Sequence, residues 1–353
     1  MRRLQDYKPI AIDLFCGAGG LTRGLKDAGF KVLAGVEINP VAARTYKANH
    51  PRVKLYENDI KDIHGERITN DLNIQVGELD LLAGCPPCQG FSSHRTRNRP
   101  PAKSDIRNDL IFEFLRITEQ LLPKTIMLEN VPALAKDWRV EVVRNRLREL
   151  GYIIDGEFCQ IKNAADYGVP QRRKRLLIKA SRFGVIFNPA NHTRQRTVRD
   201  ALKGLAQYGI SGDPLHDIPE LRSDKVRKII ASIPKNGGSR SDLPKHLWLD
   251  CHKRNEGSYK DVYGRMQWDS IAPTITGGCH NPSKGRFLHP VEDRAITLRE
   301  AALLQTFPKS YRFFVEDGKE AIALMIGNAL PPKFIKAHAI EYIKHLGSIK
   351  NES

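Results

Sequence analysis

The sequence has no apolar run long enough to cross a membrane, and we expect no secretory leader, because its first residues lack the pattern of one. Its first apolar run, residues 9–15, contains Asp13 and leads into a glycine-rich turn. The 353 residues also show no internal repeat and no low-complexity tract. These absences argue against a membrane-embedded protein and a repeat array, so we expect a cytoplasmic protein with no membrane contact.

Cysteine is scarce and scattered. The six cysteines are Cys16, Cys85, Cys88, Cys159, Cys251 and Cys279. Without secretory features, this spacing favours reduced thiols over a disulfide framework. The pairs Cys251-His252 and Cys279-His280 leave a zinc site open as an alternative, although nothing in their spacing is diagnostic.

Acidic residues are in deficit, with 40 Asp and Glu against 57 Lys and Arg and a net charge of +17. Such an excess favours a polyanionic partner, nucleic acid before a membrane surface. The charge is uneven, because residues 191–290 hold 17 Lys and Arg against 10 Asp and Glu. A solvated basic surface is the simpler alternative.

Strand-like and helix-like segments alternate in the first half of the chain. The expected strands are residues 9–15, 31–36, 79–83, 125–128 and 175–180, and the expected helices are 21–28, 39–49, 109–122 and 140–150. This order predicts an α/β fold with a doubly wound, mostly parallel sheet. Such sheets bind ligands beyond the carboxyl ends of their strands.

The character of the chain changes near residue 187, where proline, glycine and basic residues mix with weak periodicity. We therefore expect a catalytic domain over 1–186, a smaller irregular domain over 187–325, and a segment 326–353 that returns to the first. Thr297 and Glu300 form a capping-box pattern that opens a helix. The last helix should begin near Pro332.

The stretch DLFCGAGG follows an expected strand and precedes an expected helix. Gly17 and Gly19 permit a tight turn and close approach of a ligand. Glu37 lies twenty residues after Gly17, where a carboxylate accepts hydrogen bonds from ribose hydroxyls. Thr22 occupies the place of a third glycine, which disfavours a nicotinamide oxidoreductase. An adenosine-containing cofactor fits this pattern, and Asp59 could bind its adenine amino group.

The stretch GCPPCQGFSSHR places Cys88 directly behind two prolines. Proline restricts its own backbone and that of the preceding residue, so the path into this thiol is stiff. A thiol held in this way suits a nucleophile, a metal ligand or half of a disulfide. A thiol–disulfide enzyme or metal protein using Cys85 and Cys88 is therefore one alternative.

Two further stretches carry polar groups beside expected strands. MLENV puts Glu129 and Asn130 just past a strand. In QRRKR, alternate residues share one face, so Gln171, Arg173 and Arg175 should point together. Donors grouped in this way suit an anion or the edge of a base.

Together these stretches resemble the DNA cytosine-5 methyltransferases. DLFCGAGG, Glu37, NDI, GCPPCQGFS, ENV, QRRKR, LREAALLQTFP and GNALPP occur in the order of that family's motifs, across residues 9–335. The resemblance implies methyl transfer from S-adenosylmethionine to carbon 5 of cytosine in a specific duplex sequence. The product would be S-adenosylhomocysteine, and no metal is needed. A tRNA cytosine-5 methyltransferase and a non-catalytic DNA-binding module are the alternatives.

The resemblance also assigns roles. Cys88 would add to carbon 6 of a flipped-out cytosine. Glu129 would hydrogen-bond or protonate ring nitrogen 3, Arg175 would hold the base oxygen or a phosphate, and Arg173 would support it. The basic loop after Cys88, residues 92–107, would close over the base.

Positions matching the family's cofactor contacts or flanking them are Phe15, Gly17, Ala18, Gly19, Glu37, Ile38, Asp59, Ile60, Pro87, Leu110, Asn328 and Ala329. Cys85 and Leu330 depart from residues found elsewhere in the family. Asn58 stands where many members have glycine, so the turn before Asp59 is expected to be less tight. The target-recognition region would be residues 191–286. We expect a monomer associated with the nucleoid, with a cognate restriction endonuclease as a candidate partner.

Overall fold

The structure is a computed structural model that describes residues 8–87, 109–191, 194–254 and 261–352. Its contacts divide the chain into two compact units. The first unit comprises residues 1–167, 174–191 and 330–353, and the second comprises 168–173 and 192–329. The expected domain limits lay at 186/187 and 325/326, a few residues before the changes at 191/192 and 329/330.

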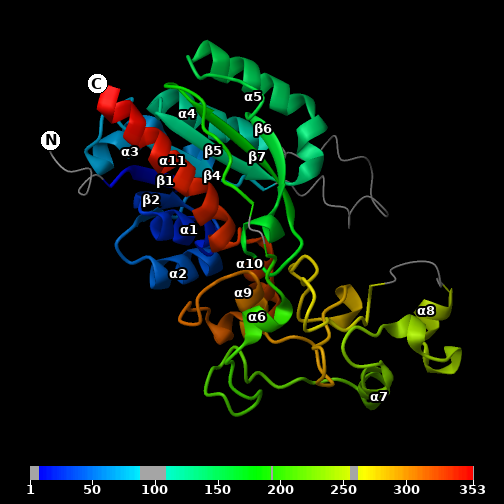
Figure 1. Ribbon diagram of the computed structural model, residues 1–353. Helices are drawn as coiled ribbons and strands as arrows, with labels where there is room; N and C mark the ends of the chain where they lie inside the picture. The colour runs from blue at the N-terminus through cyan, green and yellow to red at the C-terminus, as the bar shows by residue number, and fades with distance from the viewer. Residues whose placement is uncertain (1–7, 88–108, 192–193, 255–260, 353) are drawn as a thin grey trace. The chain divides into compact units, whose positions relative to one another are not determined.

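The first unit is built on a seven-stranded sheet with strand order β3-β2-β1-β4-β5-β7-β6 (Figure 1). The strands are β1 (Ile10–Leu14), β2 (Lys31–Val36), β3 (Lys54–Tyr56), β4 (Leu81–Gly84), β5 (Thr125–Asn130), β6 (Cys159–Asn163) and β7 (Lys174–Ser181). The five strands from β3 to β5 pair in parallel, and β7 runs antiparallel to both β5 and β6. The expected doubly wound, mostly parallel sheet is confirmed.

Helices of the first unit are α1 (Gly20–Ala28), α2 (Pro40–Asn49), α3 (Gly65–Leu72), α4 (Leu110–Leu121), α5 (Trp138–Glu149) and α11 (Pro332–Glu352). The main core joins alternate strand residues such as Ile12 and Leu14 to apolar side chains of α3, α4 and α5. Asp13, on the other face of β1, contacts α1 instead. Helix α11 packs closely against α1. A Cβ atom at Gly24 of α1 would lie 2.5 Å from Cβ of Ile335, so this close packing requires glycine there.

The second unit contains short helices joined by irregular segments, as expected. They are α6 (Val198–Leu202), α7 (Asp224–Ser232), α8 (Asp250–Arg254), α9 (Leu298–Leu304) and α10 (Lys319–Asn328). The capping box is present at α9, where the Thr297 side chain accepts from Glu300 N–H and the Glu300 carboxylate accepts from Thr297 N–H. Arg294 pairs with the same buried carboxylate through both terminal nitrogens, at 2.8 Å each.

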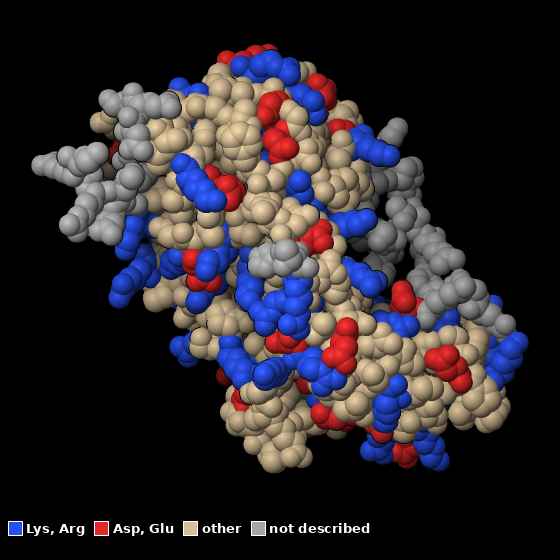
Figure 2. Space-filling view, viewed as in Figure 1, with Lys and Arg blue, Asp and Glu red and all other residues tan. Residues whose placement is uncertain are grey.

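Part of the positive charge lies inside the second unit. Arg265 is 0% exposed, and its guanidinium donates to the carbonyls of Ile230, Ile233 and His289 at 2.7, 3.1 and 3.0 Å. On the outside, Lys and Arg side chains are interspersed with acidic ones over the face shown in Figure 2. The net charge therefore overstates the number of cations that face a ligand.

Candidate active site

The turn after β1 has an unusual backbone. Phe15, Gly17 and Gly19 have φ angles of 61°, 54° and 93°, in the left-handed region. Glycine adopts this conformation freely, whereas at Phe15 it stores strain of the kind found at ligand sites. An added Cβ at Gly17 would meet no atom within 4 Å, so the space beside the turn is open.

Glu37 follows β2, and its carboxylate is fixed against this turn. Its Oε2 accepts from the Gly17 N–H at 2.8 Å, and its Oε1 accepts from the Asn39 N–H at 2.7 Å. Burial raises the pKa of Glu37, and the hydrogen bonds from the backbone of Asn39, Gly17 and Ile38 oppose that rise. Each oxygen keeps a second lone pair, so the carboxylate can still accept ribose hydroxyls. These residues fit the adenosine portion of a cofactor.

Asp13 and Thr22 form a buried pair beneath the turn that sequence analysis did not identify. Thr22 Oγ1 donates to Asp13 Oδ2 at 2.6 Å and lies 2.9 Å from the Tyr46 hydroxyl. Burial raises the pKa of Asp13 to about 7, hydrogen bonds from Thr22 lower it, and the charge of Glu37 raises it further. Thr22, which occupies the place of a third glycine, thus anchors α1 to β1.

The other cofactor positions lie partly in each unit. Asp59 caps the short helix Ile60–Asp62 by accepting from Lys61 N–H at 3.1 Å, and Ile60 is buried in the core. Among the rest, Ala18 is buried, Phe15 and Leu110 are half-buried, and Ile38, Pro87 and Asn328 are exposed. Asn328 and Ala329 belong to the second unit, at the end of α10.

Glu129 is the centre of a second polar cluster. It is 1% exposed and is the penultimate residue of β5, so it lies within the strand and not just past it. Arg175 from β7 approaches its Oε1 with Nε at 2.9 Å, and the Cys85 thiol after β4 donates to its Oε2 at 2.8 Å. The side chains thus come from β5, from β7 and from the segment that follows β4, with Glu129 in the middle.

Asn130 holds the segment that leads to Cys88. Its Nδ2 donates to the Pro86 carbonyl at 3.0 Å, and its Oδ1 accepts from the Val131 N–H at 2.8 Å. The ENV motif therefore fixes the proline turn from the neighbouring strand, a role that sequence analysis had not assigned. Cys88 and the basic loop 92–107 lie outside the described residues.

Gln171 and Arg173 are buried in the second unit, while Arg172 and Lys174 are exposed. Arg173 donates to the carbonyls of Ile275 and Gly327 at 3.0 and 2.9 Å. Gln171 donates to Oε1 of Gln305 at 2.8 Å. These contacts tie the second unit together, and the catalytic role of Arg173 stays a prediction.

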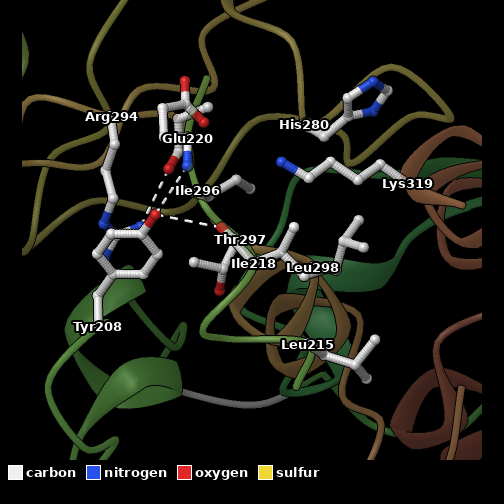
Figure 3. Close-up of a pocket in the computed structure, with 11 residues that line it drawn as sticks. Tyr208, Leu215, Ile218, Glu220, His280, Arg294, Ile296, Thr297, Leu298 and Lys319 are labelled. Atoms are coloured by element: carbon white, nitrogen blue, oxygen red, sulfur yellow. Dashed lines mark hydrogen bonds between the residues drawn. The ribbon is translucent and has the colours of Figure 1, made fainter. Parts of the chain in front are cut away.

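The second unit also contains a small hollow of about 20 Å³, lined in part by Tyr208, Glu220 and Arg294 (Figure 3). The Tyr208 hydroxyl donates to the Ile218 carbonyl at 3.2 Å and accepts from the Glu220 N–H at 3.0 Å. The Arg294 guanidinium lies over the Tyr208 ring, 4.6 Å from its centre. These polar groups bind one another, so the hollow is better explained by packing than by a ligand.

In the parts of the chain that the structure describes, no group of three His, Cys, Asp or Glu side chains is placed to hold a metal ion. Cys251 is exposed, and Cys279 is buried, which raises the pKa of its thiol to about 12. No described helix is both long and apolar enough to cross a membrane.

Comparison with known proteins decides the family. The C-5 cytosine-specific DNA methylase family matches residues 10–344. The chain belongs to this family. It is thereby a DNA (cytosine-5-)-methyltransferase, and the family and fold imply S-adenosylmethionine as the methyl donor. The open space at the glycine turn and the acceptors of Glu37 fit this cofactor.

Its relatives include bacterial restriction–modification methyltransferases. The type II methylase M.HgiDII of Herpetosiphon aurantiacus is 42% identical over 91% of each chain. The type II methyltransferase M1.HphI of Haemophilus parahaemolyticus is 33% identical, over 94% of this chain and 86% of the relative.

Solved structures of methyltransferases also match the fold of this chain. A DNA modification methyltransferase encoded within an E. coli prophage matches with a TM-score of 0.66 and 26% identity, covering 96% of this chain and 99% of that one. Spodoptera frugiperda DNMT2 matches with a TM-score of 0.60 and 20% identity, over 96% and 100% of the chains, which shows a shared fold alone.

Proposed function

We propose that this methyltransferase acts on a cytosine flipped out of duplex DNA, through a covalent bond between the Cys88 sulfur and carbon 6 of the base. The observation that carries the proposal is the Glu129 carboxyl, held by Arg175 and Cys85 beside the turn that leads to Cys88. Flipping costs a few kcal/mol, and basic side chains around the base would offset it.

Carbon 5 of cytosine is a poor nucleophile, so the ring must be activated first. The Cys88 thiolate forms a bond to carbon 6, and the electrons of the 5,6 double bond shift towards carbon 4 and nitrogen 3. The ring thereby becomes an enamine, in which carbon 5 is electron-rich. Glu129 supplies a hydrogen bond or a proton to nitrogen 3, so that negative charge does not build up there. Arg175 keeps the carboxyl oriented and holds the base oxygen or a nearby phosphate, supported by Arg173.

S-adenosylmethionine supplies an electrophilic methyl group to carbon 5. Glu37 would orient the ribose, while Phe15 and the glycine turn would contact the adenosine and methionine portions. Asp59 and Ile60 contact the adenine. Water then takes the proton from carbon 5, and the electrons of that C–H bond re-form the 5,6 double bond as the bond between carbon 6 and sulfur breaks, which restores the Cys88 thiolate and the aromatic ring.

Duplex DNA is favoured over tRNA as the substrate. The family is described as a DNA methylase, and M.HgiDII and M1.HphI are named as type II enzymes. The structural match to DNMT2 at 20% identity extends to the fold only. We further propose that residues 191–286 recognise the DNA sequence, that the enzyme acts as a monomer at the nucleoid, and that a cognate endonuclease shares its site.

The covalent step can be tested with DNA that carries 5-fluorocytosine. Fluorine does not leave carbon 5 as a proton does, so enzyme, DNA and S-adenosylmethionine should form a complex that survives denaturation. Cys88→Ser should abolish both this complex and methyl transfer. Peptide mapping should find the adduct on Cys88, and an adduct on Cys85 would show that the nucleophile is wrongly assigned.

A further inference from the structure

Cys85 lies between β4 and the two prolines, and its side chain faces Glu129. The Cys85 sulfur is 2.8 Å from Oε2, and the Arg175 Nε is 2.9 Å from Oε1 of the same carboxyl. Glu129 itself is 1% exposed. A thiol hydrogen bond at Oε2 and an ion pair with Arg175 at Oε1 thus hold the two oxygens of one buried carboxyl.

We infer that Cys85 is a positioning residue for methyl transfer, whose thiol orients the Glu129 carboxyl and sets how readily it binds a proton. This inference rests on the proposed role of Glu129 as the donor to nitrogen 3 of cytosine. It adds a role for Cys85, which takes no part in the bond formation of the proposed mechanism.

The Cys85 thiol and the Arg175 guanidinium affect the proton on Glu129 differently. Arg175 is a permanent cation, so it favours the ionised carboxylate. Lys162 lies opposite Arg175 in the pairing of β6 with β7, and the exposed Lys174 precedes Arg175 in the chain. Of these cations, Arg175 is the one paired with Glu129, and it favours the ionised carboxylate.

A thiol is a weak hydrogen-bond donor, so it stabilises an ionised carboxylate less than a hydroxyl would. Glu129 must carry or share a proton to act as a donor to nitrogen 3. A thiol on Oε2 therefore keeps the oxygen in place while opposing protonation less than a stronger donor. If Cys85 only filled space, its replacement would change stability and leave the proton affinity of Glu129 unchanged.

Two substitutions at Cys85 should act in opposite directions. Cys85→Ala removes a donor to the carboxylate and should raise the pKa of Glu129 by about one unit. Cys85→Ser substitutes a stronger donor and should lower it. Cys159→Ser is the matched control, because Cys159 is a free, half-buried cysteine in the same unit, on β6.

The measurement is a carbon-13 NMR titration of the full-length protein labelled at glutamate carboxyls, with Glu129→Gln identifying the resonance. Opposite shifts in the two Cys85 variants, with none in Cys159→Ser, support the inference. An unmoved titration, or shifts in the same direction, overturns it. If Cys85→Ala does not fold, the direction of the shift in Cys85→Ser decides alone.

Kinetics then separate this inference from the proposed function. The alkaline limb of the kcat profile should follow the Glu129 titration in both variants, with KM for DNA unchanged, because the proton donor acts in the bound complex. If the alkaline limb of the kcat profile does not shift with the Glu129 titration, the link between Cys85 and catalysis is overturned. Wild-type turnover by Glu129→Gln would refute the proposed role of Glu129, whatever the titration at Cys85 shows.

Discussion

At the residue scale, Glu37, the proposed acceptor for the ribose, is held in a fixed orientation by the backbone. Both of its oxygens accept backbone N–H groups, from Gly17 and from Asn39. The carboxylate is therefore oriented by the same turn that leaves open space at Gly17. Little side-chain entropy remains to be lost when ribose hydroxyls bind.

We predict that Glu37→Gln weakens S-adenosylmethionine binding by roughly 10- to 100-fold, the range for losing a hydrogen bond to a charged group. The amide is close in shape, but its NH₂ group would face a backbone N–H at either position. Calorimetry with DNA-free protein measures the effect. Glu78→Gln is the control, because Glu78 also accepts a backbone N–H, from Gln75 at 2.9 Å, but lies before the start of β4, whereas Glu37 lies after the end of β2. Equal affinity in both variants would contradict the ribose role.

The pH dependence of cofactor binding has a definite sign. Because burial raises the pKa of Glu37, its carboxylate takes up a proton at a higher pH than an ordinary glutamate. The acceptor is present above that raised pKa and is lost as the pH falls through it. Binding of the cofactor should therefore weaken towards acid pH in the wild type, and the Gln variant should show less of this dependence.

The motif residues of the site were accessible from sequence, whereas their supporting contacts were not. Glu37 and Glu129 stand at the ends of strands that apolar runs reveal. Cys85 and Glu129 are 44 residues apart, and their contact depends on the pairing of β4 with β5. Likewise, Thr22 was interpreted as a missing glycine because its partner Asp13 is identified only by the packing of α1 on β1.

At the element scale, α11 carries a buried histidine. His338 is 1% exposed, and its ring centre lies 4.7 Å from those of Tyr167 and of Phe334. Neither ring nitrogen has a hydrogen-bond partner among the described residues. Burial lowers the pKa of His338 to about 3, and the charges of Lys179 and Lys162 lower it further.

We predict that His338→Phe stabilises the protein and flattens its acid sensitivity. Because folding lowers the pKa of His338, the unfolded chain binds a proton more readily than the folded protein. The stability is therefore full above the unfolded pKa of about 6.5, and it falls as the pH drops from there towards the folded pKa. A buried polar group without a hydrogen bond costs about 1–3 kcal/mol of stability, and the replacement by phenylalanine removes this cost. Urea unfolding between pH 4.5 and 8 measures both effects.

His345→Phe provides the contrast on the same helix. The Nε2 atom of His345 lies 2.7 Å from the Ser181 hydroxyl, so this replacement should destabilise the protein at neutral pH. If the two substitutions change the free energy of unfolding equally at neutral pH, the predicted difference in hydrogen bonding between the two histidine rings is wrong.

Elements with strong periodicity or clear caps were predictable. Strand β2 covers Lys31–Val36 and α11 begins at Pro332, as expected. Helix α3 and strand β6 were missed because their sequences, GERITNDL and CQIKN, are largely polar and pack through a few residues only. Helix α10 was missed because its apolar residues, as in AIALMI, run together without a polar face.

At the scale of the whole molecule, the two units carry different residues of the proposed mechanism. Glu37, Glu129 and Arg175 belong to the first unit, and residues 192–286 belong to the second. The second unit has its own small core, which includes Ile230, Ile233 and Leu288, and the buried Arg265 holds carbonyls around it. Recognition and chemistry are therefore expected to be separable.

We predict that replacing residues 191–286 with the equivalent region of a relative that methylates another sequence transfers the specificity and keeps carbon 5 of cytosine as the target. The donor must keep an arginine at position 265, because this side chain also binds the His289 carbonyl outside the exchanged region. Base-resolution mapping of methylcytosine in cells that express the chimera identifies the site. Methylation of the original sequence would show that specificity is encoded elsewhere in the chain.

The same chimera tests how the charge is used. Phosphate contacts release counterions, so DNA affinity should fall linearly on a log–log plot against salt, with a slope set by the number of phosphates contacted. Buried arginines such as Arg265 and Arg173 bind carbonyls, so they should not add to this slope. An exchange that removes exposed cations should reduce the slope for every DNA sequence alike. An exchange that alters only residues in contact with bases should change the preferred sequence and leave the slope unchanged.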